Sequence, residues 1–312
     1  MKKKIIDSRL RNVCAGLSAV AAAPGVALGC ACGCGVFDVA TSSMLPEGPG
    51  GMAYFELAYQ DQNRNWSGTS WSPSVDNGDK KIETAFETIG LQYMFNRSWG
   101  AELELPFASR NFKTEDAAGA VVDRRWDAFG DIRLKAIYTG FSPDMSSGLT
   151  FGLKLPSGSD NRLADVVDRD SEIGSGSTDV LLGAFTRGEF GSSPWNWYGQ
   201  GELDMPFLKQ GDYRPGVEAD VAWGIYYEGL TLGRARITPI AQIIGSWRGR
   251  DNGAAANPDD SGYQRVMLSP GIEIHVHPVT FYADVEIPVY DHVTGNQLIA
   301  PVLFKLSLSY MF

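Results

Sequence analysis

The chain has 312 residues, of which 44% are hydrophobic and 21% are charged, and its formal net charge is −10. This length suits one large barrel or two soluble domains. No run of about 18 apolar residues follows the N-terminal segment, which excludes a transmembrane helix, and the acidic balance argues against nucleic acid or anionic lipid as a partner.

The first 29 residues have the features of a cleaved signal peptide. Basic residues at positions 2–4, 9 and 11 precede an apolar stretch at 13–28. Ala27-Leu28-Gly29 fits a small-x-small cleavage pattern, with Ala31 as an alternative cut. We therefore exclude 1–29 from the fold. Removal of these five basic residues and of Asp7 lowers the formal charge of the remaining chain to −14.

A cysteine-containing tail is predicted at residues 30–51, in the periplasm. Cys30, Cys32 and Cys34 lie two positions apart in a segment without apolar periodicity. Three such thiols are compatible with a disulfide or an inert tether, with a soft metal such as Cu(I) or Zn, or with lipidation or a redox partner. Zinc sites usually have CxxC spacing and four ligands, which this segment lacks. The sequence leaves these alternatives open, and it does not decide whether 42–51 enters the barrel.

About twelve strands follow within residues 52–312, separated by connections that are alternately long and short. Long external loops and short periplasmic turns are typical of a transmembrane antiparallel up-and-down β-barrel with an even strand number. The fold class predicted is therefore all-β. The strands are expected at 52–60, 82–95, 99–107, 127–139, 148–156, 177–188, 195–206, 214–227, 231–247, 263–276, 278–288 and 299–312.

Residues 299–312 show most clearly how these strands alternate between apolar side chains and polar or small ones. Membrane lipid must contact the apolar set, because a basic residue on that face near mid-membrane would cost roughly 2–4 kcal/mol. The sheet must also close, since an open edge in hydrocarbon leaves backbone groups unsatisfied. Phe312 matches the C-terminal signal that the barrel-assembly machinery reads. Aromatic girdle residues are expected at Trp99, Trp126, Trp195, Trp197, Trp247, Tyr310 and Phe312.

The charged residues of the strands must then face the barrel lumen. Acidic residues predominate, which favours a cation-selective pore. Salt bridges that simply fill a narrow lumen are an equally good interpretation. The predicted pore-lining residues are Glu56, Glu102, Glu104, Arg133, Lys135, Lys154, Glu202, Asp204, Glu218, Asp220, Glu273, Asp284, Glu286 and Lys305.

Four short motifs carry a resemblance to a known family. They are Phe129-Gly130-Asp131-Ile132, then LKLPSG at 153–158, GSGSTD at 174–179 and Ser269-Pro270-Gly271-Ile272. With these motifs in this order, the chain from about residue 52 onward resembles a family of outer-membrane transporters. The family is named for channels of a meta-pathway of phenol degradation. The resemblance implies passive or facilitated passage of small compounds without naming a substrate.

The sequence thus predicts a channel or transporter for small molecules or ions in the outer membrane of a Gram-negative bacterium. The alternative is a structural barrel that anchors a periplasmic redox or metal partner through Cys30–Cys34. No nucleophile–base spacing supports an enzyme. No cofactor is expected apart from the soft metal considered for the cysteines.

Overall fold

The computed structural model describes residues 44–46, 48–116, 118–160, 169–209 and 211–312. The predicted signal peptide and Cys30, Cys32 and Cys34 lie outside these residues. None of the described residues forms a helix that is long and apolar enough to cross a membrane.

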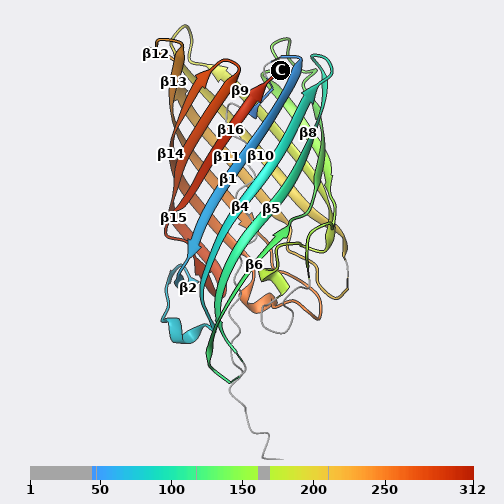
Figure 1. The fold of residues 1–312 in the computed structure, drawn as a ribbon, viewed down its shortest axis with the longest axis vertical. Helices are drawn as coiled ribbons and strands as arrows, with labels where there is room; N and C mark the ends of the chain where they lie inside the picture. Colours follow the sequence, from blue (N-terminus) through green and yellow to red (C-terminus); the bar gives the residue numbers. More distant parts are fainter. Residues whose placement is uncertain (1–43, 47, 117, 161–168, 210) are drawn as a thin grey trace, which may run out of the picture.

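Twelve antiparallel strands form a closed barrel, as predicted (Figure 1). Each strand pairs with its neighbours in the ring, and β1 closes it by pairing with β16, with Met52 opposite Met311 and Gln60 opposite Leu303. The ring consists of β1 (Gly50–Gln62), β4 (Asp79–Met94), β5 (Trp99–Glu115), β7 (Arg133–Tyr138), β8 (Ser147–Lys154), β9 (Ser177–Glu189), β10 (Trp195–Lys209), β11 (Glu218–Tyr227), β13 (Ala235–Arg248), β14 (Tyr263–Val276), β15 (Val279–Ile299) and β16 (Leu303–Met311).

Strand β16 shows the two environments of the wall. Phe304, Leu306 and Leu308 are 44%, 41% and 51% exposed on the outer face. The side chains between them, from Lys305 to Ser309, point inward and are at most 5% exposed. A protein in water would not leave a continuous apolar belt uncovered, so the outer face is suited to hydrocarbon.

The barrel has two different ends. At one end, the top in Figure 1, the strands are joined by residues 95–98, 139–146, 190–194, 228–234 and 277–278, and the C-terminus lies there. We call it the short-turn end. The opposite end, with the segments 155–176 and 249–262 among its connections, is the long-loop end.

Several segments predicted as loops contain strands at the long-loop end. β2 (Arg64–Gly68) and β3 (Ser70–Trp71) form a hairpin, and β2 pairs with the end of β15, which extends to Ile299. β5 likewise continues to Glu115 and pairs with β6 (Val121–Phe129). Beyond the lipid belt neither face needs to be apolar, so these strands lack the alternation by which strands were recognised.

The predicted strand 127–139 is interrupted. β6 ends at Phe129 and β7 begins at Arg133. The side chains that point into the barrel stand at even-numbered positions before this break and at odd-numbered positions after it. Trp126 is therefore 6% exposed and points into the barrel, while Phe129 is 69% exposed. The prediction of Trp126 as a girdle residue was wrong for this reason.

The predicted strand 231–247 is also divided. Gly233 adopts a positive φ of 62°, which places a turn between β12 (Leu230–Leu232) and β13. The two strands form a small hairpin at the short-turn end.

Candidate functional site in the barrel lumen

A cavity of about 240 Å³ lies inside the barrel. Of the predicted pore-lining residues, these line it: Glu56, Glu102, Glu104, Arg133, Lys135, Lys154, Glu202, Asp204, Glu218 and Lys305. Asp220, Glu273, Asp284 and Glu286 are at most 7% exposed and are not among its lining residues.

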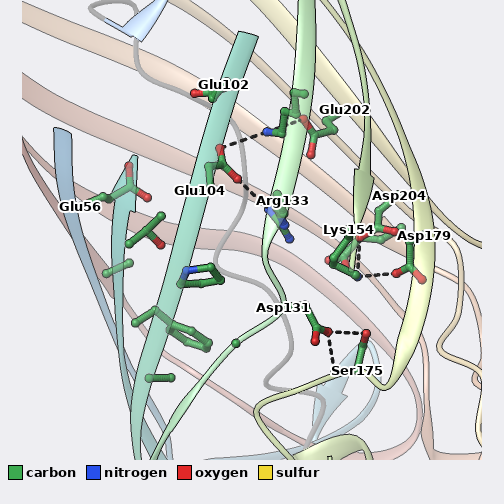
Figure 2. Close-up of a pocket in the computed structure, with 18 of the residues that line it drawn as sticks. Glu56, Glu102, Glu104, Asp131, Arg133, Lys154, Ser175, Asp179, Glu202 and Asp204 are labelled. Atoms are coloured by element: carbon green, nitrogen blue, oxygen red, sulfur yellow. Dashed lines mark hydrogen bonds and ion pairs between the residues drawn. The ribbon is translucent and has the colours of Figure 1, made fainter. Parts of the chain in front are cut away.

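Lys135 is the centre of the first charged network. Figure 2 shows its partners Glu104 and Glu202. Its Nζ lies 3.1 Å from Glu104 Oε1 and 3.0 Å from Glu202 Oε2. Arg133 Nη1 lies 3.8 Å from the other Glu104 oxygen. The Tyr54 hydroxyl lies 2.9 Å from Glu102 Oε1 and 3.2 Å from Glu104 Oε1 and shares its one proton between these acceptors. Lys135 therefore connects carboxylates on β5 and β10 across the strands between them.

Two glycines leave room on the wall beside Lys135. Gly152 on β8 pairs with Lys135, and Gly183 on β9 pairs with Glu202. A Cβ at Gly152 would collide with the backbone of β7, and one at Gly183 would collide with the Thr150 side chain. The long lysine side chain can therefore extend toward β10 over a flat part of the wall.

Lys154 is the centre of a second network, closer to the long-loop end. Its Nζ lies 2.5 Å from Asp179 Oδ2 and 2.6 Å from Asp204 Oδ2. One ammonium group thus pairs with two carboxylates, of which Asp179 is fully buried. Lys305 lies 3.7 Å from Glu56 in a similar but looser pair.

A mainly neutral network fills another part of the interior. Gln242 Nε2 lies 2.9 Å from the Ser269 hydroxyl, 3.0 Å from the Tyr282 hydroxyl and 2.9 Å from Asp284 Oδ2, and its two N–H groups donate among these three oxygens. Tyr198 donates to the Gln242 carbonyl oxygen. Asp284 Oδ2 accepts bonds from Gln242, Ser269 and Tyr282, which hold this carboxylate, 4% exposed, away from the cavity.

Residues 44–46, which we call the N-terminal plug, lie inside the barrel. Leu45 is 6% exposed and packs in a cluster with Met94, Ile137, Met145, Phe185, Tyr198, Ile240 and Tyr282. Gln92 Nε2 donates to the Met44 carbonyl at 3.2 Å, and Arg187 donates to the Pro46 carbonyl at 3.0 Å. The sequence left open whether 42–51 enters the barrel, and these three residues lie inside it and line the cavity.

Residues 169–175, which we call the strap, lie on the long-loop side of the cavity. Ile173 packs against a cluster of Ile82, Phe112, Trp126, Ala128 and Leu298. Arg110, only 2% exposed, donates to the Ser171 carbonyl and, at 3.0 Å, to Thr84. Burial, together with the nearby Asp251, raises the pKa of Asp170 to about 7, although Arg248 opposes this shift.

Some lining residues were missed by the sequence analysis. Tyr54 has the same parity as Glu56 in a predicted strand, so alternation alone could have placed it inside. Arg110 lay in a segment predicted to be a loop, and the contacts of Arg169 and Arg248 depend on loop folding. Four acidic lining residues were also missed: Asp131, Asp170, Glu172 and Asp179. In total, ten acidic and seven basic residues line the cavity. The described part of the chain contains no group of three His, Cys, Asp or Glu side chains arranged to hold a metal ion.

The sequence matches no protein-family model and no curated protein. Solved structures do resemble the fold. The COG4313 outer membrane channel from Pseudomonas putida F1 is 14% identical with a TM-score of 0.64, and the match covers 88% of this chain and all of that one. The β domain of the Bordetella autotransporter BrkA is 13% identical with a TM-score of 0.54, covering 85% of this chain and all of that one. The fold is thus that of a Gram-negative outer-membrane β-barrel, as predicted.

Proposed function

We propose that the protein is an outer-membrane channel for small solutes that favours cations. The observation that carries the proposal is a cavity inside a closed barrel, lined by ten acidic and seven basic residues. Carboxylates that outnumber ammonium and guanidinium groups attract cations and repel anions. The short-turn end faces the periplasm in this proposal, because short turns are periplasmic in such barrels.

The cavity lies between two segments of the chain itself. The N-terminal plug contributes Met44, Leu45 and Pro46 to its lining, and the strap contributes Asp170 and Ile173 among others. For a solute to pass through the channel, these two segments must move out of the lumen. We therefore expect the complete protein to conduct in short or infrequent openings rather than as a permanently open pore.

Planar-bilayer recordings test the proposal. The purified protein is compared with a variant that lacks residues 30–46, which leaves β1 from Gly50 onward intact. We expect frequent openings in the deletion variant and, across a KCl gradient, a reversal potential of the sign for K⁺ selectivity. An anion-selective current would contradict the charge argument. No current from either protein, together with crosslinking of a partner through Cys30, Cys32 or Cys34, would favour the anchoring function instead.

A further inference from the structure

Three of the four motifs noted in the sequence meet at the side chain of Asp131. Asp131 is 6% exposed at the break between β6 and β7. Its Oδ1 accepts a hydrogen bond of 2.9 Å from the Gly158 amide. Its Oδ2 accepts bonds of 2.7 Å from the Ser175 amide and 2.5 Å from the Ser175 hydroxyl (Figure 2). One carboxylate therefore holds both ends of the segment between β8 and β9.

The local backbone explains why these residue types occur here. Ile132 donates from its amide to the Ser157 hydroxyl at 2.8 Å, and the Leu155 amide donates to the Ile132 carbonyl at 2.8 Å. A Cβ at Gly174 would collide with the Gly158 backbone, so the two ends of the segment approach closely only because both residues are glycines. At this break, hydrogen bonds to the side chains of Asp131 and Ser157 thus replace the pairing between strands.

The strap is held by charge on its other side as well. Arg169 donates to the carbonyls of Gly174 at 3.0 Å and Ser175 at 2.7 Å and forms an ion pair with Asp160 at 3.2 Å. Its guanidinium lies 4.7 Å from the centre of the Tyr213 ring. Both Asp131 and the strap residues Asp170, Ile173 and Ser175 line the cavity.

We propose that Asp131 is a positioning residue that holds the strap in the lumen and so sets how easily solutes reach the cavity from the long-loop end. Charge-assisted bonds of this kind are stronger than neutral ones, and three of them converge on one buried carboxylate. The inference rests on the proposed channel function, but the contact it assigns can be tested without any current.

The experiment measures access to the cavity directly. In a background without cysteines, Thr150→Cys places a reporter thiol in the cavity lining. The rate of its labelling by a membrane-impermeant maleimide is compared with and without Asp131→Ala. Asp123→Ala is the matched control, because Asp123 is an exposed carboxylate nearby on β6 with one ion pair to Lys113. Hydrogen exchange of residues 169–175 is measured on the same samples.

We expect Asp131→Ala to accelerate labelling at least tenfold and to accelerate exchange in the strap, whereas Asp123→Ala changes neither. Ser175→Ala removes one of the three donors and should give a smaller increase in the same direction, which keeps the test valid if Asp131→Ala does not fold. Unchanged labelling in the folded variants would overturn the proposal, even if strap exchange increased. A parental protein that conducts no ions would refute the channel function, while the labelling rates would still decide the role of Asp131.

Discussion

Leu45 gives the sharpest test of the N-terminal plug. Its side chain is 6% exposed and packs among the apolar residues of the interior cluster. Leu45→Ala leaves the backbone of the plug unchanged, so the bonds from Gln92 to Met44 and from Arg187 to Pro46 are retained. The substitution therefore isolates the apolar contribution to holding the plug in place.

The magnitude follows from the buried side chain. Leu45→Ala removes three carbon atoms from an apolar environment, at about 0.8 kcal/mol for each, or about 2.4 kcal/mol in all. Because about 1.4 kcal/mol corresponds to a tenfold change in an equilibrium constant, the ratio of displaced to seated plug should rise roughly 50-fold. A cavity left at the site would add to this value.

Single-channel recording measures the change as open probability. Leu232→Ala is the control, because Leu232 is 72% exposed at the end of β12, at the same end of the barrel. We expect a large rise for Leu45→Ala and none for Leu232→Ala. An open probability that is equal in both variants, in proteins of equal heat stability, would mean that the plug does not limit conduction.

Two further predictions concern the charged groups. Lys135→Gln leaves Glu104 and Glu202 without their shared ammonium group. The reversal potential in a KCl gradient should therefore shift toward the equilibrium potential of K⁺. Lys113→Gln, on the exposed outer surface, should leave the reversal potential unchanged. Burial raises the pKa of Asp170 to about 7, so the strap binds a proton more tightly when it is packed in the lumen. Packing is therefore favoured at low pH and weakens as pH rises toward about 7. Because a thiol itself reacts faster as pH rises, variants are compared at the same pH. Asp170→Asn should slow Thr150→Cys labelling more at pH 8 than at pH 5.

The alternation of side chains was sufficient to predict the barrel. In β16 and in residues 279–287 of β15 the side chains alternate between the outer and inner faces, and this alternation can be recognised from the sequence alone. It was also sufficient to place Lys135 and Lys154 on the inner face, because the parity of their strands was correct. The parity argument failed at 127–129, because the strand break at Gly130–Ile132 resets the alternation.

The segments that lie across the lumen could not be predicted from the sequence. The plug and the strap belong to segments without periodicity, and their positions depend on contacts with residues far away in the chain, such as Arg187 with Pro46 and Arg110 with Ser171. The Asp131 junction was visible only as three separate motifs. Nothing in their spacing shows that one carboxylate contacts two of them, since the chain between β8 and β9 can close in many ways.

The two segments on either side of the cavity are held by different forces, which leads to a last prediction. Leu45 is held by apolar contacts and the plug has no titratable side chain, whereas Asp170 gives the strap a response to pH. Described contacts do not join the plug to the strap, so their displacements should be independent and their probabilities should multiply. Leu45→Ala should therefore raise the open probability by the same factor at pH 5 and at pH 8. A factor that depends strongly on pH would show instead that the plug and the strap move together.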